Sequence, residues 1–137
     1  MKHAICYIST ATSEFNNSEI ENLLTEWKEK NSSKDVKGIL LFSEGHFFQV
    51  LEGEKEKVLA LYSSIKEDPR HSNIIQVMGK DITRGSLDDY IVEHLKKPGF
   101  SRPQLISKYC ESVKGMDPYT QQQIKIVLDS FIDTQVL

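Results

Sequence analysis

The sequence predicts an α+β fold, a ferredoxin-like sandwich with a mixed five-stranded sheet and two C-terminal helices covering the other face of that sheet. The chain has 137 residues, of which 39% are hydrophobic, and this suits one domain with a real core. Stretches rich in strand-forming residues and amphipathic helical stretches follow one another in the order β-α-β-β-α-β-β. Two further helical stretches come last.

The first half of the chain predicts a strand, a helix and a hairpin. Residues 2–9 include AICYIS, which is rich in strand-forming side chains. Apolar residues recur at helical spacing over 20–27, and the polar residues at 16–18 can cap the start of that helix. Residues 36–42 and 46–51 are predicted strands, because the Ser-Glu-Gly between them suits a tight turn.

A second helix is predicted to begin at Glu54 and to end at Asp68-Pro69, because proline disfavours helical backbone at the residue before it. Its predicted inner side comprises Val58, Leu59, Leu61, Tyr62 and Ile65. The carboxylates of the LEGEKEK run over 51–57 are expected on solvated faces and at the helix start.

The next stretch predicts two short strands. One covers 73–78 and is followed by a polar link through Gly79 and Gly85, and the other covers 90–95. The Lys-Lys-Pro-Gly at 96–99 resembles a boundary, because proline and glycine interrupt regular structure there.

Two amphipathic helices are predicted beyond that boundary, over 102–113 and 118–132. Their apolar content is too small for a separate domain. We therefore divide the chain into a main unit over 1–95 and a C-terminal helical cap over 96–137.

Composition and charge favour a cytoplasmic protein that binds neither nucleic acid nor a membrane. The net charge of −3 and the pI near 5.8 do not provide a basic surface for either partner. No apolar run is long enough to span a bilayer, and the N-terminus lacks the features of a signal peptide. Cys6 and Cys110 are expected to be reduced. Metal binding is not expected, because no ligand spacing links His3, His46, His71 and His94.

Three polar residues stand out against this apolar framework. Gln49 lies among the apolar residues of the third predicted strand, and Tyr7 lies centrally in the first. In this topology the first and third strands are neighbours in the sheet, so the two side chains can face each other. Asn31 lies where the first helix ends. One interpretation is that the three side chains converge between the two helices. Buried there, they would need polar partners, which a planar ligand with polar edges could supply. Alternatively, the phenol reaches the rim of the core, the glutamine faces solvent and the asparagine caps a helix.

Several motifs in order make the chain similar to the BLUF family, blue-light sensors that use flavin, over about residues 1–95. The strongest likeness covers 31–71, with a glycine-led second strand, the pattern G-x-F-x-Q-x-L-E-G and the pattern D-x-R-H. CYIST supplies the strand-one tyrosine of the family, and Ser9 follows two residues later.

The resemblance implies that Tyr7 donates an electron and then a proton to the excited flavin. It implies that Gln49 lies between that phenol and the flavin, where its rotatable amide changes hydrogen bonds and red-shifts the absorption. The implied cofactor is FAD, with FMN or riboflavin possible, because the ring contacts are shared among these flavins.

The resemblance also implies a set of cofactor contacts. Asn31 would hold the C4=O and N3–H edge of the ring, and Arg70 would contact the C2=O side. Asp68 would orient Arg70, and His71 would border the ring or the ribityl chain. The residues expected to form the apolar walls are Ile20, Leu23, Leu24, Ile39, Leu41, Val58 and Ile65.

One departure from the family concerns the last strand, where many members carry Trp-Ser-Met. Here Tyr90, Ile91 and Val92 stand in those places. The residues that relay changes at Gln49 outwards therefore differ from those of many members, and the candidates are Ser9, Tyr90 and Val92. Tyr90 could be a second electron donor or a hydrogen-bond partner of Gln49. Alternatively, Tyr90 and Val92 are core residues.

The function expected from these features is a photoreceptor rather than an enzyme. With no further segment after the two helices, its output would pass to a downstream signalling protein or through a change in a homo-oligomer. A regulatory module that binds an amino acid or nucleotide without photochemistry is one alternative. A hydrolase of the acylphosphatase type is another, although residues 9–15 lack the arginine that its phosphate loop requires.

Overall fold

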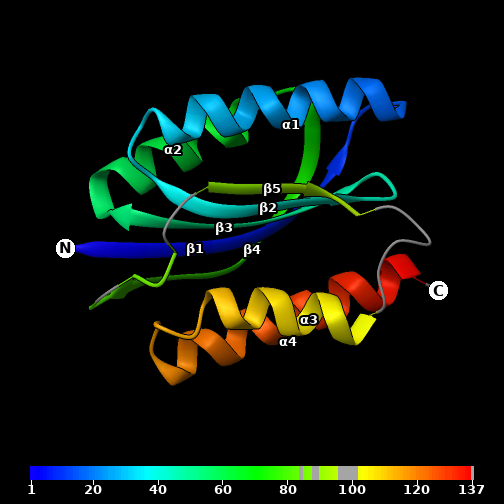
Figure 1. Ribbon diagram of the computed structural model, residues 1–137. Helices are drawn as coiled ribbons and strands as arrows, with labels where there is room; N and C mark the ends of the chain where they lie inside the picture. The colour runs from blue at the N-terminus through cyan, green and yellow to red at the C-terminus, as the bar shows by residue number, and fades with distance from the viewer. Residues whose placement is uncertain (84, 88–89, 96–101, 137) are drawn as a thin grey trace.

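A single five-stranded sheet lies between two pairs of helices in the computed structural model, which describes residues 1–83, 85–87, 90–95 and 102–136 (Figure 1). The elements are β1 (Lys2–Ala11), α1 (Asn17–Ser32), β2 (Lys37–Ser43), β3 (His46–Glu54), α2 (Lys55–Glu67), β4 (His71–Ile82), β5 (Tyr90–His94), α3 (Arg102–Ser112) and α4 (Pro118–Val136).

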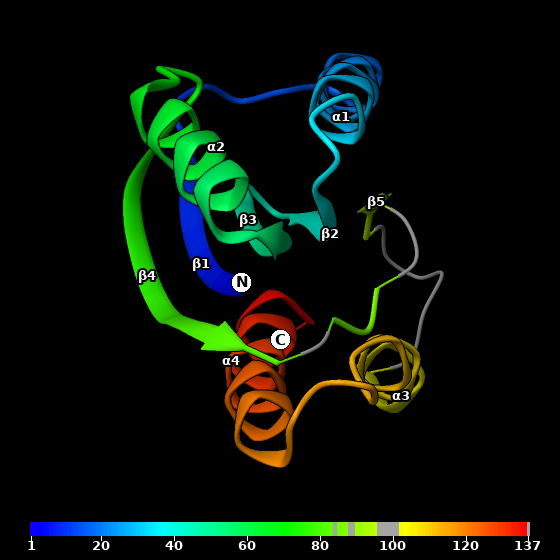
Figure 2. The same cartoon turned by 90° about the vertical axis from the view of Figure 1, so that its left-hand side faces the viewer.

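The strand order is β4-β1-β3-β2-β5, in which β2 and β5 pair in parallel and the other neighbours pair antiparallel. Helices α1 and α2 cover one face, and α3 and α4 lie across the other (Figure 2). The predicted fold class and element order are therefore confirmed. The predicted boundary at 96–99 lies outside the described residues.

Local sequence features explain where the elements near the site begin and turn. Asn16 caps α1 by accepting from the Glu19 backbone N–H, and the Glu19 carboxylate accepts from the Asn16 N–H in return. The β2–β3 hairpin turns at Glu44 and Gly45, with φ of 49° and 83°, backbone angles that favour glycine at the second position.

Two expectations about individual elements are wrong. β4 does not end at 78 but continues to Ile82, because the ten-residue β1 supplies pairing partners along its length, from Lys2 opposite Ile82 to Ala11 opposite His71. Leu59 does not lie on the inner side of α2. It is 41% exposed, because the buried positions Val58, Leu61 and Tyr62 follow the i, i+3, i+4 pattern and leave it on the outer side.

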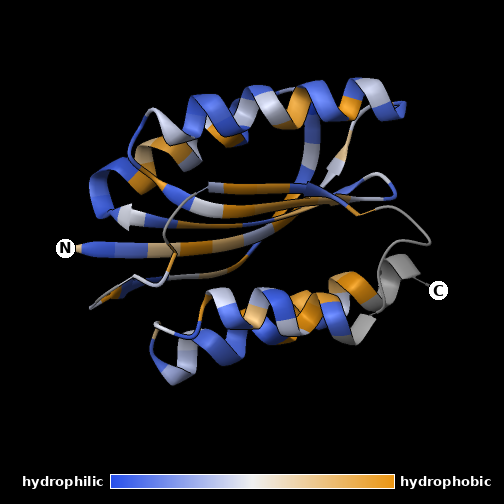
Figure 3. Ribbon diagram, viewed as in Figure 1, coloured by the Kyte–Doolittle hydropathy of each residue, from blue (hydrophilic) through white to orange (hydrophobic). Residues whose placement is uncertain are grey.

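The sheet separates two apolar cores. Leu40 and Leu51 belong to the cluster that packs against α1 and α2, whereas Ile39, Leu41 and Val50 belong to the cluster beneath α3 and α4. Alternate residues of a strand point to opposite faces, so neighbouring positions serve different cores. Hydrophobic colouring on the strands between polar outer helix faces shows the same layering (Figure 3).

Candidate functional site

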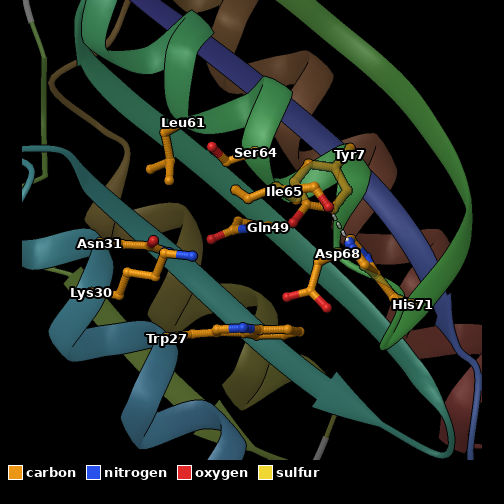
Figure 4. Close-up of a pocket in the computed structure, with 10 residues that line it drawn as sticks. All are labelled: Tyr7, Trp27, Lys30, Asn31, Gln49, Leu61, Ser64, Ile65, Asp68 and His71. Atoms are coloured by element: carbon orange, nitrogen blue, oxygen red, sulfur yellow. Dashed lines mark hydrogen bonds between the residues drawn. The ribbon is translucent and has the colours of Figure 1, made fainter.

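A pocket opens between α1 and α2, above β1 and β3 (Figure 4). It is lined by three strand residues, three residues of α1 and a row of residues along α2 to its C-terminal end. The ten lining residues are Tyr7, Trp27, Lys30, Asn31, Gln49, Leu61, Ser64, Ile65, Asp68 and His71.

The pairing of β1 with β3 brings Tyr7 and Gln49 together. The two residues lie directly opposite each other in the antiparallel ladder, which confirms the predicted neighbourhood of the first and third strands. Both side chains are 2% exposed, and Gln49 Nε2 donates a hydrogen bond to the Tyr7 hydroxyl. A donor amide and a phenol are therefore coupled at the floor of the pocket.

The other end of the Gln49 amide is its carbonyl oxygen. Its Oε1 is buried without a hydrogen bond among the residues that the structure describes. Leaving a buried acceptor unsatisfied costs about 1–3 kcal/mol, so such an atom calls for an explanation. Figure 4 shows Gln49 between Tyr7 and Asn31 at the pocket floor, where a ligand with a hydrogen-bond donor could reach it.

Asn31 closes the α1 side of the pocket and is tied to the edge of the sheet. Its Nδ2 donates to the Tyr90 hydroxyl over 2.8 Å, and both residues are buried. Tyr90 pairs with Gly38 in the parallel β2–β5 ladder. A Cβ atom at Gly38 would lie 2.9 Å from the Tyr90 ring, so glycine there lets the ring pack on the backbone.

Burial dominates the electrostatics of both tyrosines. Removal from water raises the pKa of Tyr7 well above its usual value, the nearby Tyr90 adds to this, and the hydrogen bond from Gln49 opposes it. Burial likewise raises the pKa of Tyr90, against the hydrogen bond from Asn31. Both phenols therefore keep their protons in the resting protein.

His71 borders the pocket in a fixed orientation. Its Nδ1 lies 2.8 Å from Ser9 Oγ and its Nε2 lies 2.6 Å from the Ile65 carbonyl oxygen. Ser9 is thus buried beside His71 on the Tyr7 side of β1. Val92 packs at the edge of the same core as Tyr90.

Arg70 is outside the set of lining residues. Its guanidinium makes a two-pronged contact with Asp68, with Nε–Oδ1 at 3.0 Å and Nη2–Oδ2 at 2.8 Å, and its Nη1 lies 3.0 Å from Glu26 Oε2. Asp68 itself lines the pocket, and the hydrogen bonds from Arg70 hold its pKa below the usual range. A ring contact by Arg70 stays a prediction.

The apolar residues predicted as walls divide into three groups. Ile65 lines the pocket as expected. Ile20, Leu23 and Leu24 are buried under α1 in the same core as Tyr7, and Val58 is buried in that core under α2, without being among the lining residues. Ile39 and Leu41 were wrongly assigned to the pocket: they face α3 and α4, because the alternation of β2 turns Leu40 toward the helices that flank the pocket.

Sequence reasoning did not name Lys30, Leu61 and Ser64 as site residues, and Trp27, which packs at the edge of the core, also lines the pocket. Helical spacing contains a signal for most of them. Trp27 precedes Asn31 by four residues on α1, and Leu61, Ser64, Ile65 and Asp68 follow one another along one side of α2. Knowing that Asn31 and Asp68 lie at one pocket would have identified these neighbours.

Two kinds of site are not found within the described part of the chain. No group of three or more His, Cys, Asp or Glu side chains is placed to hold a metal ion there. None of the helices described combines the length and the apolar character needed to cross a membrane.

Comparison with known proteins identifies the family. Residues 3–91 match the model of BLUF, sensors of blue-light using FAD. The blue light- and temperature-regulated antirepressor BluF of Escherichia coli is 45% identical over 60 residues, which are 44% of this chain and 15% of that protein. Photoactivated adenylate cyclase subunit beta of Euglena longa is 33% identical over 73 residues, 53% of this chain and 8% of that protein.

Solved structures extend the likeness to nearly the whole chain. Klebsiella pneumoniae BlrP1 with FMN and cyclic diGMP superposes with a TM-score of 0.77 at 25% identity, over 97% of this chain and 35% of that one. The BLUF domain of BlrP1 gives 0.76 at 26% identity over 96% of this chain and 90% of that one. BlsA in its photo-activated state gives 0.66 at 27% identity, over 95% and 94%. The chain spans about a third or less of the length of the first of these relatives, and it belongs to the BLUF family, sensors of blue-light using FAD.

Proposed function

We propose that Tyr7 and Gln49 carry the light reaction of this sensor, in the pocket between α1 and α2. The observation that supports this most directly is the buried Gln49 amide, whose Nε2 donates to the Tyr7 hydroxyl while its Oε1 has no partner among the described residues. A buried amide with one satisfied and one free end fits a ligand edge that offers polar groups. Of the flavins, FAD is the form that the family description names.

Cofactor binding is assigned to the polar residues around this amide. Asn31 and Gln49 would meet the polar edge of the ring, with Ile65 and Leu61 from α2 along its faces. Asp68 and His71 would border the far end of the ring. When bound, the flavin supplies blue-light absorption and an excited state that takes an electron from a nearby phenol.

Tyr7 is the proposed electron donor. A buried phenol holds its proton tightly in the resting state, as the raised pKa of Tyr7 shows. Loss of an electron makes a phenol strongly acidic, so the hydroxyl proton must then move to a neighbouring acceptor. In the resting protein the Gln49 Nε2 donates to this hydroxyl, so the Gln49 Oε1 can accept the proton only after the amide has turned its oxygen toward Tyr7.

Gln49 is the proposed switch. Its Nε2 now faces Tyr7 and its Oε1 faces the pocket, so rotating the amide by half a turn exchanges a donor for an acceptor at both ends. Such an exchange moves no backbone and needs no covalent bond. Because the amide is buried, water does not compete for its hydrogen bonds in either arrangement.

The output is proposed to be protein contact rather than catalysis by this chain. Tyr90 and Val92 on β5 and Ser9 on β1 lie next to the site, and we propose them as relay residues toward a downstream signalling protein or a homo-oligomer. Residues 1–95 would bind flavin and 96–137 would act as the helical cap. A cytoplasmic location agrees with this role.

The photochemical assignment is tested with purified, flavin-loaded protein under blue light. Tyr7→Phe should bind flavin but lose the red-shifted state, and Gln49→Leu should bind flavin and show no red shift. Tyr62→Phe is the matched control, because its ring lies 5.5 Å from that of Tyr7 in the same core, and it should cycle normally. A normal photocycle in Tyr7→Phe would remove Tyr7 from this role.

The output is tested separately. Light-scattering measurement of mass in darkness and under illumination should show a change in the oligomer, or a pulldown should capture a partner in only one of the two states. Gln49→Leu should abolish either difference. Identical masses and identical captured proteins in light and darkness would contradict the proposed output.

A further inference from the structure

Four side chains form a bridge between the two helices that flank the pocket. Glu26 and Trp27 belong to α1, Asp68 ends α2, and Arg70 lies just before β4. Arg70 contacts all three others: the two carboxylates by hydrogen bonds and the Trp27 ring by stacking, with its guanidinium carbon 5.2 Å from the ring centre. We call this group the Arg70 bridge.

The Arg70 bridge lies over one wall of the pocket. Trp27 and Asp68 line the pocket, and Figure 4 shows the Asp68 carboxylate above the Trp27 ring. Glu26 and Arg70 lie behind them, outside the lining set. A planar ligand held between α1 and α2 would therefore be enclosed on this side by a pair of groups that Arg70 holds together.

Several features make this bridge stronger than an ordinary surface ion pair. The contact with Asp68 is two-pronged, and the Asp68 side chain is 14% exposed. Hydrogen bonding to Asp68, and then to Glu26, raises the pKa of Arg70, and the hydrogen bonds from Arg70 lower the pKa of Asp68. The aromatic face of Trp27 adds an attraction for the cation, whereas exposed single pairs contribute little.

We propose that Arg70 is a positioning residue that ties α1 to the end of α2 and thereby sets how slowly flavin leaves the pocket. This role is additional to the ring contact that the family resemblance implies for Arg70, because it acts through Glu26, Trp27 and Asp68. It rests on the assignment of this pocket as the flavin site. Departure of a ring enclosed between two helices requires them to separate, and the Arg70 bridge resists that separation.

The first test measures the rate of flavin dissociation in darkness, with apoflavodoxin as the trap for released flavin. Glu26→Gln should accelerate dissociation about two- to fivefold, because it removes one arm of the bridge without touching the pocket. Glu29→Gln is the matched control: it removes the same charge one turn later on an exposed position of α1 and should leave the rate unchanged. Added salt should accelerate dissociation from the unmodified protein more than from Glu26→Gln.

The second test uses the apoprotein. Trp27 is the one tryptophan of the chain, so its fluorescence reports on the surroundings of this single side chain. Glu26→Gln and Arg70→Lys should both make Trp27 more accessible to acrylamide quenching, because a lysine cannot form the same planar stack and fork. Glu29→Gln should not.

The outcomes separate this proposal from its alternatives. Faster dissociation in Arg70→Lys together with an unchanged rate in Glu26→Gln would overturn it in favour of a direct ring contact. Equal quenching of Trp27 in all variants would also contradict it. Neither readout depends on the photoreaction, because the first is taken in darkness and the second in protein without flavin, so a failure of Tyr7 or Gln49 in the photochemical test leaves them unaffected.

Discussion

Gln49 and Glu52 lie three residues apart on β3, and both are buried polar side chains, at 2% and 3% exposure. They point to opposite faces of the sheet. Gln49 faces the pocket and leaves its Oε1 without a partner among the described residues. Glu52 faces α3 and α4, where its carboxylate accepts from the backbone N–H groups of Ser86 and Leu87, the latter at 2.6 Å.

The difference separates a ligand site from a structural one. A saturated buried carboxylate organises its surroundings: Ser86, held by Glu52, donates through its hydroxyl to the Ser112 carbonyl and accepts from the Gly115 N–H. This links β3 to the end of α3 and the turn after it. The Gln49 Oε1, by contrast, links no other described segment, and it needs a hydrogen-bond donor from another molecule. We therefore expect mutations of Glu52 to lower the stability of the fold, and mutations of Gln49 to remove the light response with little effect on stability.

The largest expected effect is on stability at Glu52. Glu52→Ala should lower the free energy of unfolding by about 3 kcal/mol, because the Ser86 and Leu87 N–H groups lose their acceptor in a buried place. Glu52→Gln keeps an acceptor oxygen and should lose about 1 kcal/mol. Urea denaturation of the apoproteins measures both. Equal stability of Glu52→Ala and the unmodified protein would show that the segment with Ser86 and Leu87 does not depend on this carboxylate.

A smaller effect follows from the titration of Glu52. Burial raises the pKa of Glu52 above its usual value, and the N–H groups of Leu87 and Ser86 oppose this. In the window from the ordinary glutamate pKa up to the raised one, the folded state binds more protons than the unfolded state, so this group's contribution to stability falls as pH rises. The stability advantage of the unmodified protein over Glu52→Gln should shrink across that window. An advantage that grows with pH would contradict this sign.

At Tyr90 the effect should be about 1 kcal/mol. Tyr90→Phe removes the acceptor of the Asn31 side chain and fills the same space, so the loss is that of one buried hydrogen bond. Thermal or urea unfolding measures it. If Tyr90 is a relay residue, the variant should keep the red shift and lose coupling to the output. Unchanged recovery kinetics and unchanged coupling would make it a core residue only.

Gln49→Leu should have the smallest effect on stability, within about 0.5 kcal/mol in the apoprotein. It removes the donor to Tyr7, which costs, but it also removes the unsatisfied Oε1, which offsets that cost. Its loss of the light response should nevertheless be complete. A stability loss as large as that of Glu52→Ala would show that Gln49 is also a structural residue.

Much of the arrangement followed from local pattern. Helical spacing and turn residues located the helices and the hairpin, and the strand order placed Tyr7 opposite Gln49, as the β1–β3 ladder shows. The family motifs identified the BLUF family before any geometry was known. These features depend on residues close in sequence or on a topology with few alternatives.

Other features depended on contacts between distant segments. The sequence placed Glu52 on a solvated face, yet it is buried, because Ser86 and Leu87, more than thirty positions away, supply its partners. Periodicity could not say which face of β2 meets α1, so Ile39 and Leu41 were assigned to the wrong core.

The sequence by itself determined the family, the order of the elements and the presence of an oxidisable phenol and an amide on neighbouring strands. Only the tertiary structure decided which buried polar groups are satisfied. It alone placed Trp27 at the pocket wall with Arg70 behind it, and left Gln49 Oε1 without a partner among the described residues. The physical reason is that periodicity along one segment records burial, whereas hydrogen-bond satisfaction depends on atoms contributed by several segments at once.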